Sequence, residues 1–178
     1  KNLACNAKLQ GSIEHFCSKN AMNIDGLGVQ IVEQLMHSNL IQKIDDLFNL
    51  SYSDLVVLDR FQEKSANNLI RAINESKGTT FPRFVFALGI PNVGQHISKV
   101  IDRYCNSSID NLRQLKVEEM EEIDGIGSTV ADAIENFFKD KENNKIINKC
   151  LQNGVNIIPT LFNKSNQKML NKRIVITG

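Results

Sequence analysis

Apolar residues recur along this chain at intervals of three and four, the spacing that places side chains on one face of an α-helix. Such patterns cover residues 44–50, 53–58, 67–76 and 116–123. Strand-like alternation of apolar and polar residues is rare apart from residues 173–177. Proline, which interrupts helices, occurs only 3 times in 178 residues. The pattern therefore predicts an all-α fold of short helices that bury their apolar faces against one another.

One sequence motif occurs four times. The two most similar copies are IDGLGVQIVEQL at residues 24–35 and IDGIGSTVADAI at residues 123–134. Between them lie LDRFQEKSANNL at residues 58–69 and IPNVGQHISKVI at residues 90–101. The copies begin 32 to 34 residues apart, and each lies between two helical patterns. We therefore predict four tandem helix-hairpin-helix motifs in one compact domain over residues 9–158.

The first glycine of each hairpin allows a sharp turn. Gly26 and Gly125 can adopt the positive φ that such a turn requires. The apolar residue that follows, Leu27 or Ile126, is expected to pack into the core. The third copy has Asn92 at this position, and asparagine tolerates positive φ better than most residues. We therefore expect the third hairpin to keep the same geometry.

The second glycine of the hairpin begins the next helix, at Gly28, Gly94 or Gly127. The first N–H groups of a helix have no carbonyl partner, and glycine has no side chain to obstruct them. Together with the positive end of the helix dipole, these groups can bind a phosphate without lysine. His96 lies two residues beyond Gly94 and could reach the same phosphate. The hairpins therefore indicate phosphate sites.

The second copy departs from the other three. Arg60 and Gln62 stand where the glycines would be, and Lys64 and Ser65 lie where the next helix would begin. Their side chains could contact phosphate in place of backbone N–H groups. The second copy could equally be a structural repeat, and the sequence leaves both interpretations open.

The net charge is too small to attract nucleic acid by itself. Lysine and arginine total 21 against 20 acidic residues, which gives +1. DNA binding must therefore come from local geometry. Because contacts to the phosphate backbone carry no base information, we expect little sequence specificity.

The four cysteines, Cys5, Cys17, Cys105 and Cys150, form no C-x-x-C pair, and no cationic apolar leader precedes them. No apolar run approaches the roughly 18 residues of a membrane span. We therefore expect a cytoplasmic protein that has no association with membranes. All of these cysteines except the first are expected to be small apolar core residues.

Two acidic segments could suggest other chemistry. Residues 43–46, KIDD, superficially resemble the lysine-centred motif of nucleotidyltransferases, but Asp46 stands where that motif has glycine. We interpret this segment as an acidic helix start. The acidic run over residues 118–122 is expected to form a solvated helix face.

Longer segments resemble a known family. HFCSKNAMNIDGLG, at residues 15–28, resembles the start of the helix-hairpin-helix domain of bacterial NAD-dependent DNA ligases. Residues 46–73, residues 81–94 and the fourth hairpin follow in the order expected for that domain. Together these segments cover roughly residues 9–158, the whole of the predicted helical domain.

In this family a four-cysteine zinc finger precedes the hairpins and a BRCT domain follows them. KNLACNAK, at residues 1–8, resembles the last strand of the zinc finger, so Cys5 would be its fourth ligand and could not hold zinc by itself. Residues 169–178 resemble the first strand of the BRCT domain, after a linker over residues 159–168. We therefore expect a chain cut from something longer, with short truncated appendages at both ends.

The resemblance implies that the parent enzyme seals nicks in duplex DNA during replication and repair. It would adenylate a lysine from NAD, pass AMP to the 5′-phosphate and join this to the 3′-hydroxyl, with magnesium and zinc as further cofactors. None of those catalytic residues lies in this chain, so we expect no cofactor and no activity in it alone. The implied partners are double-stranded, nicked DNA and the catalytic and BRCT domains of the parent chain. We expect a monomer.

Two alternatives remain. The hairpins could be purely structural, in an interaction module that links ligase domains or repair partners. Another tandem-hairpin protein, such as an excision-nuclease subunit, would share the hairpins but not HFCSKNAM or FVFALGI. The candidate DNA-binding residues lie in the four hairpins and the first turns after them: Gly26, Gly28, Arg60, Lys64, Ser65, Asn92, Gly94, His96, Gly125, Gly127, Ser128 and Thr129.

Overall fold

Helices make up most of the chain, as the hydrophobic pattern predicts. The computed structural model describes residues 3–59 and 61–160. Its elements in chain order are α1 (Leu3–Cys17), α2 (Val29–His37), the 3-10 helix η1 (Ile44–Asn49), α3 (Tyr52–Val56), α4 (Glu63–Ser76), β1 (Gly78–Thr80), α5 (Phe81–Ala87), α6 (Gln95–Cys105), α7 (Ile109–Gln114), α8 (Val117–Glu121), α9 (Ser128–Lys139), α10 (Lys141–Gln152) and β2 (Asn156–Ile158). The predicted all-α class is confirmed.

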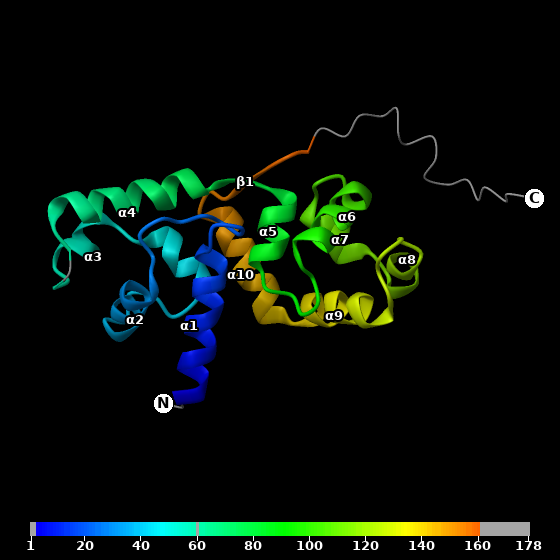
Figure 1. Ribbon diagram of the computed structural model, residues 1–178, viewed down its shortest axis with the longest axis horizontal. Coiled ribbons are helices and arrows are strands. Elements are labelled where there is room, and N and C mark those ends of the chain that lie inside the picture. Colours follow the sequence, from blue (N-terminus) through cyan, green and yellow to red (C-terminus); the bar gives the residue numbers. More distant parts are fainter. Residues whose placement is uncertain (1–2, 60, 161–178) are drawn as a thin grey trace, which may run out of the picture.

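Each predicted hairpin joins two helices that contact each other, in the order α1–α2, α3–α4, α5–α6 and α8–α9. We call residues 3–76 the first hairpin pair and residues 81–139 the second. In Figure 1 the two pairs occupy opposite ends of an elongated molecule, and α10 lies between them. Buried side chains from both pairs, including Phe16 and Phe84, form one continuous apolar core. The hairpins are thus fixed on a common scaffold.

Two short strands were not predicted from the sequence. β1, which connects the two hairpin pairs, lies parallel to β2, with Gly78 opposite Asn156 and Thr80 opposite Ile158. The N–H of Asn156 also donates to the carbonyl of Lys77 at 2.7 Å. Three-residue strands are too short to show an alternating pattern. Their pairing places the last described residues, around β2, beside the segment that connects the two hairpin pairs.

The N-terminal strand expected over residues 1–8 is wrong for the residues that the structure describes. Leu3 to Lys8 form the first turns of α1, which continues without a break to Cys17. A boundary between residues 8 and 9 would therefore fall inside a helix. The strand expected at residues 169–178 lies outside the described residues, as does most of the linker. Within the described part of the chain, no helix is both long enough and apolar enough to span a bilayer.

Candidate nucleic-acid interface

The third residue of the hairpin has a left-handed backbone in three of the copies. Its φ is 92° at Gly26, 63° at Asn92 and 88° at Gly125. Asparagine therefore replaces glycine in the third hairpin without a change of conformation, as predicted. Arg60, the equivalent residue of the second copy, lies outside the described residues.

A hydrogen bond closes the turn around this residue. In the third hairpin the N–H of Val93 donates to the carbonyl of Ile90 at 3.0 Å. Positive φ at the third position defines a type II turn, whose second position suits Pro91. The residue that closes the turn is buried, as predicted for Leu27 and Ile126. The fourth hairpin has the same bond, from the N–H of Ile126 to the carbonyl of Ile123 at 2.9 Å, so a backbone turn and one buried side chain hold both hairpins.

The helices that follow the hairpins begin in the same way. Their N-cap residues, Gly28, Gln62, Gly94 and Gly127, have φ between −110° and −74° and ψ between 167° and 179°. Any residue can adopt this extended conformation. A Cβ added to any of the three glycines would meet no atom within 4 Å. Glycine is therefore not required here by the backbone or by packing, and it leaves open space in front of the helix.

The starts of α2, α6 and α9 also keep their positive partial charge. None of the three has an acidic residue in its first turn or an N-cap side chain that accepts from the first N–H groups. At α6 the Oγ of Ser98 donates to the carbonyl of Gly94 at 3.0 Å, which leaves the N–H groups of the helix start unaffected. Several other helices have an acidic residue in the first turn: η1, α3, α4, α7, α8 and α10. A carboxylate there offsets the helix dipole and can accept from the first N–H groups. The three glycine starts therefore remain suited to an external anion.

The second hairpin is capped internally. The Oγ of Ser65 accepts a hydrogen bond from the N–H of Gln62 at 2.9 Å and donates to the carbonyl of Gln62 at 2.9 Å. Glu63 adds a negative charge in the same turn. Lys64 is exposed. These features favour the structural interpretation of this copy, because Ser65 occupies the N–H of Gln62 and the charge of Glu63 disfavours a bound anion.

The side chains predicted to flank the phosphates lie where they could do so. His96 follows Gly94 by two residues, and Ser128 and Thr129 are the first two residues of α9. All three side chains are exposed. The hydroxyls can donate to an anion beside the backbone N–H groups.

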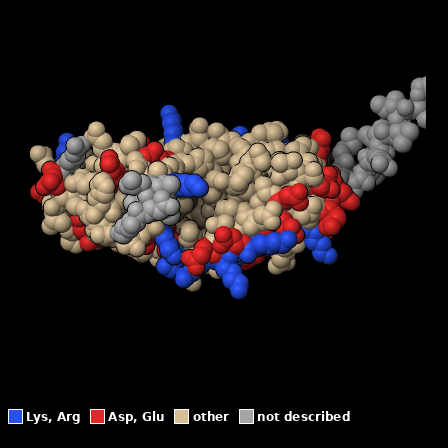
Figure 2. All heavy atoms as spheres, turned by 90° about the horizontal axis from the view of Figure 1, so that it is seen from below, with Lys and Arg blue, Asp and Glu red and all other residues tan. Residues whose placement is uncertain are grey.

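Charge is distributed without a broad basic patch on the face seen in Figure 2. Lysine and arginine are mixed with acidic residues there, and acidic side chains gather at the end that carries α8. As predicted, the glutamates of the run over residues 118–122 are exposed, while Met120 is buried. On this face attraction for a polyanion would have to be local.

The cysteines other than Cys5 are free and buried, as predicted. Burial raises the pKa of Cys17, Cys105 and Cys150 to about 12, so these thiols stay protonated near neutral pH. Among the residues that the structure describes, no three histidine, cysteine or acidic side chains are placed to hold a metal ion. The zinc ligand role of Cys5 stays a prediction, because its side chain lies outside this description.

Comparison with known proteins gives two kinds of match. A family model described as the helix-hairpin-helix motif matches residues 83–147, which include the third and fourth hairpins. The DNA ligase of Oenococcus oeni is 41% identical over 179 residues, which cover 99% of this chain and 26% of the ligase. The DNA ligase of Ligilactobacillus salivarius is 35% identical over 99% of this chain and 27% of its own length. That of Coxiella burnetii is 42% identical over 86% of this chain and 23% of its own.

The chain spans about a quarter of the length of these curated relatives, yet it aligns with the first two from end to end. The helix-hairpin-helix match and the geometry of the hairpins fall within the aligned segment. Over nearly its whole length the chain is therefore similar to a segment of DNA ligases, and it carries helix-hairpin-helix motifs.

Proposed function

We propose that this chain binds duplex DNA without sequence preference, as part of a DNA ligase, and that the starts of α2, α6 and α9 bind its phosphates. One observation carries the proposal. These three helices begin at glycines that face open space, without a side-chain cap and without an acidic residue in the first turn. Backbone N–H groups at such a helix start bind phosphate well.

The contacts would be made chiefly by the backbone. The N–H groups of the N-cap glycine and of the residue after it point away from the helix and have no carbonyl to bond. At α9 the hydroxyls of Ser128 and Thr129 would add side-chain donors, and at α6 His96 would do so. This arrangement suits a chain whose net charge is only +1. It fixes the position of the duplex but reads no bases.

The hairpins would act together on one duplex. One glycine start belongs to the first hairpin pair and two belong to the second. With starts in both pairs, the domain would straddle the minor groove and hold the phosphates of both strands. The second hairpin would support this arrangement structurally, since Ser65 caps its helix start and Glu63 places a negative charge there.

The parent enzyme would be an NAD-dependent ligase that seals nicks in replication and repair in the cytoplasm, with magnesium and zinc as cofactors of the full-length enzyme. This chain would be a monomeric binding segment without activity of its own, linked to catalytic and BRCT domains. Support comes from the family resemblance of residues 15–28 and from the ligase relatives.

Binding should be compared on two fluorescein-labelled duplexes of unrelated sequence and on a single strand. Equal affinity for the duplexes and much weaker binding of the single strand is the expected result. Strong preference for one duplex would contradict a backbone mechanism. Failure to bind either duplex at low salt would favour the interaction module instead.

A further inference from the structure

The last described helix ties the two hairpin pairs together. Asp140 is both the final cap of α9 and the N-cap of α10, so α10 continues directly from the fourth hairpin. α10 then packs on η1, which lies between the first and second hairpins. Figure 1 shows α10 in the middle of the molecule. The helix that directly follows the second pair is therefore anchored on the first pair.

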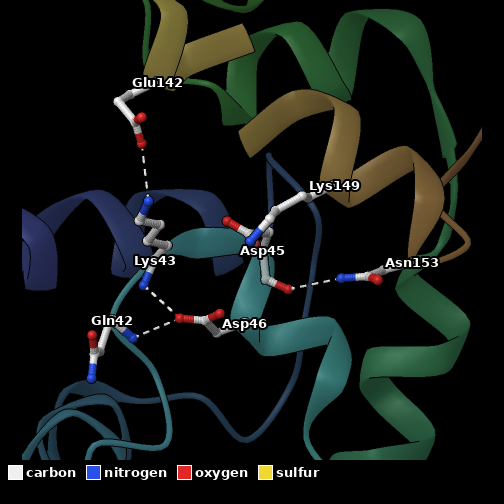
Figure 3. Close-up of polar contacts among 7 residues, drawn as sticks. All are labelled: Gln42, Lys43, Asp45, Asp46, Glu142, Lys149 and Asn153. Atoms are coloured by element: carbon white, nitrogen blue, oxygen red, sulfur yellow. Dashed lines mark hydrogen bonds and ion pairs between the residues drawn. The ribbon is translucent and has the colours of Figure 1, made fainter. Parts of the chain in front are cut away.

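An ion pair between the buried Asp45 and the half-exposed Lys149 lies at this anchor (Figure 3). Asp45, in η1, has no exposed surface, and neither of its carboxylate oxygens has a hydrogen-bond partner among the described residues. The Nζ of Lys149, from α10, lies 3.3 Å from one of these oxygens. A charge removed from water is costly unless an opposite charge accompanies it. Lys149 therefore stabilises the buried carboxylate of Asp45 and must stay close to it.

Further polar contacts fix the same face of α10. Asn153 lies one turn beyond Lys149, and its Nδ2 donates to the backbone carbonyl of Asp45 at 3.3 Å. Glu142, two turns before Lys149, accepts from the Nζ of Lys43 at 2.9 Å. These spacings of four and seven residues place Glu142, Lys149 and the C-cap residue Asn153 on one side of α10. η1 is thus held at three points along α10.

The neighbouring acidic residue is used differently. The carboxylate of Asp46 accepts from the N–H groups of Gln42 and Lys43 at 2.8 and 2.9 Å, which caps the start of η1. Cys150, next to Lys149, is fully buried, and desolvation followed by the charge of Asp45 raises its pKa to about 12. The interface around Asp45 is therefore largely shielded from water.

Contacts between the hairpin pairs also occur at α1 and α5. Arg83 of α5 donates to the carbonyls of Lys19 and Ala21 at 2.6 and 2.9 Å. His15 of α1 contacts the carbonyl of Phe86 at 2.8 Å. Attachment at both α10–η1 and α1–α5 restricts rotation of one hairpin pair against the other more than a single attachment would. Loss of the α10–η1 attachment would leave the orientation of the pairs to the α1–α5 contacts, the β1–β2 pairing and the shared core, and would so loosen it.

We infer that Asp45 and Lys149 are positioning residues for DNA binding. They hold the two hairpin pairs at the spacing that lets the helix starts of both pairs engage one duplex. The inference rests on the proposed function. Two linked binding units gain affinity only when their geometry allows both to contact the ligand at once. The affinity of the linked pair can then exceed that of either unit by about 10²-fold or more. A rigid spacing between the two hairpin pairs preserves this gain in affinity.

The test replaces Asp45 by asparagine, D45N, and compares it with E135Q. Glu135 is partly exposed and pairs with Lys139 inside α9, so E135Q removes the same charge without touching the anchor. Spin labels are placed at Val57→Cys and Tyr104→Cys, which are 76% and 40% exposed and belong to different pairs. Distances between the labels and affinity for a duplex across a salt series are then measured.

In D45N we expect a broadened distance distribution, about tenfold weaker duplex binding and a shallower salt dependence, because fewer phosphates are engaged at once. E135Q should match the unaltered chain. An unchanged distance distribution in folded D45N would overturn the inference. If D45N does not fold, Asn153→Ala removes one hydrogen bond of the same anchor and should broaden the distribution in the same direction. Failure of the unaltered chain to bind DNA would instead overturn the proposed function.

Discussion

Asn92 and Gly125 occupy the same place in the third and fourth hairpins, and both have a left-handed backbone, with φ of 63° and 88°. Most residues avoid this conformation because the Cβ approaches the following carbonyl oxygen, at a cost of about 1 to 2 kcal/mol. Asparagine and glycine avoid much of that cost. The turn, rather than the phosphate site, therefore explains the residue types at these two positions.

Gly125→Ala is expected to lower the free energy of unfolding by about 1 to 2 kcal/mol, because alanine would be strained at this φ. Asn92→Gly should leave the stability nearly unchanged. Urea unfolding of the two variants measures both effects. Equal stability of G125A and the unaltered chain would show that the left-handed turn is not required in solution.

Gly127→Gln is expected to keep the fold but weaken duplex binding by at least about tenfold, since a side chain would obstruct charge-assisted hydrogen bonds to phosphate. Gln62 already stands at the equivalent position of the second hairpin, so the backbone accepts glutamine there. Gln62→Gly is the matched control and should change affinity little. Binding by folded G127Q at the original affinity would refute the backbone contact at α9.

Ser65→Ala is expected to destabilise the chain by about 1 kcal/mol, because the N–H of Gln62 loses its acceptor. Duplex affinity should stay within about twofold if the hydroxyl serves the cap alone. Thermal unfolding and a binding titration separate the two roles. Loss of affinity with no loss of stability would restore Ser65 as a phosphate contact.

Cys150 provides a test of burial by pH. Its pKa is raised from 9.0 to about 12 in the folded chain, so the unfolded chain releases this proton first as the pH rises. The thiol contributes its full stability below pH 9 and loses it between pH 9 and 12. The stability difference between the unaltered chain and Cys150→Ala should therefore shrink by up to about 1.4 kcal/mol per pH unit in that range. A constant difference from pH 8 to 10.5 would contradict the buried, neutral thiol.

Much of the interface follows from local sequence. The glycine positions, the exception at Asn92 and the buried Leu27 and Ile126 are set by turn chemistry and hydrophobic spacing within a few residues. Turn chemistry and hydrophobic spacing also predict where α2, α6 and α9 begin. The two interpretations of the second hairpin are not separable by sequence, because the hydroxyl of Ser65 could face either its own backbone or a ligand; in the structure it faces the backbone of Gln62.

Contacts between distant segments could not be predicted. Residues 43–46 were correctly interpreted as an acidic helix start, but nothing in their spacing distinguishes the buried Asp45 from the capping Asp46. The pairing of Asp45 with Lys149 depends on how α10 folds back over η1. The N-terminal strand was inferred from resemblance alone, and α1 occupies its described residues instead.

The central claim is tested most directly by fluorescence-anisotropy titration of this chain with a nicked duplex and its intact counterpart, across a salt series. If about 4 to 8 phosphates are engaged, a plot of the logarithm of the association constant against the logarithm of the salt concentration should have a slope of about −4 to −7 for both duplexes. Little preference for the nick is expected, because backbone contacts do not sense it. A flat salt response, or no binding at low salt, would contradict phosphate binding by the hairpins.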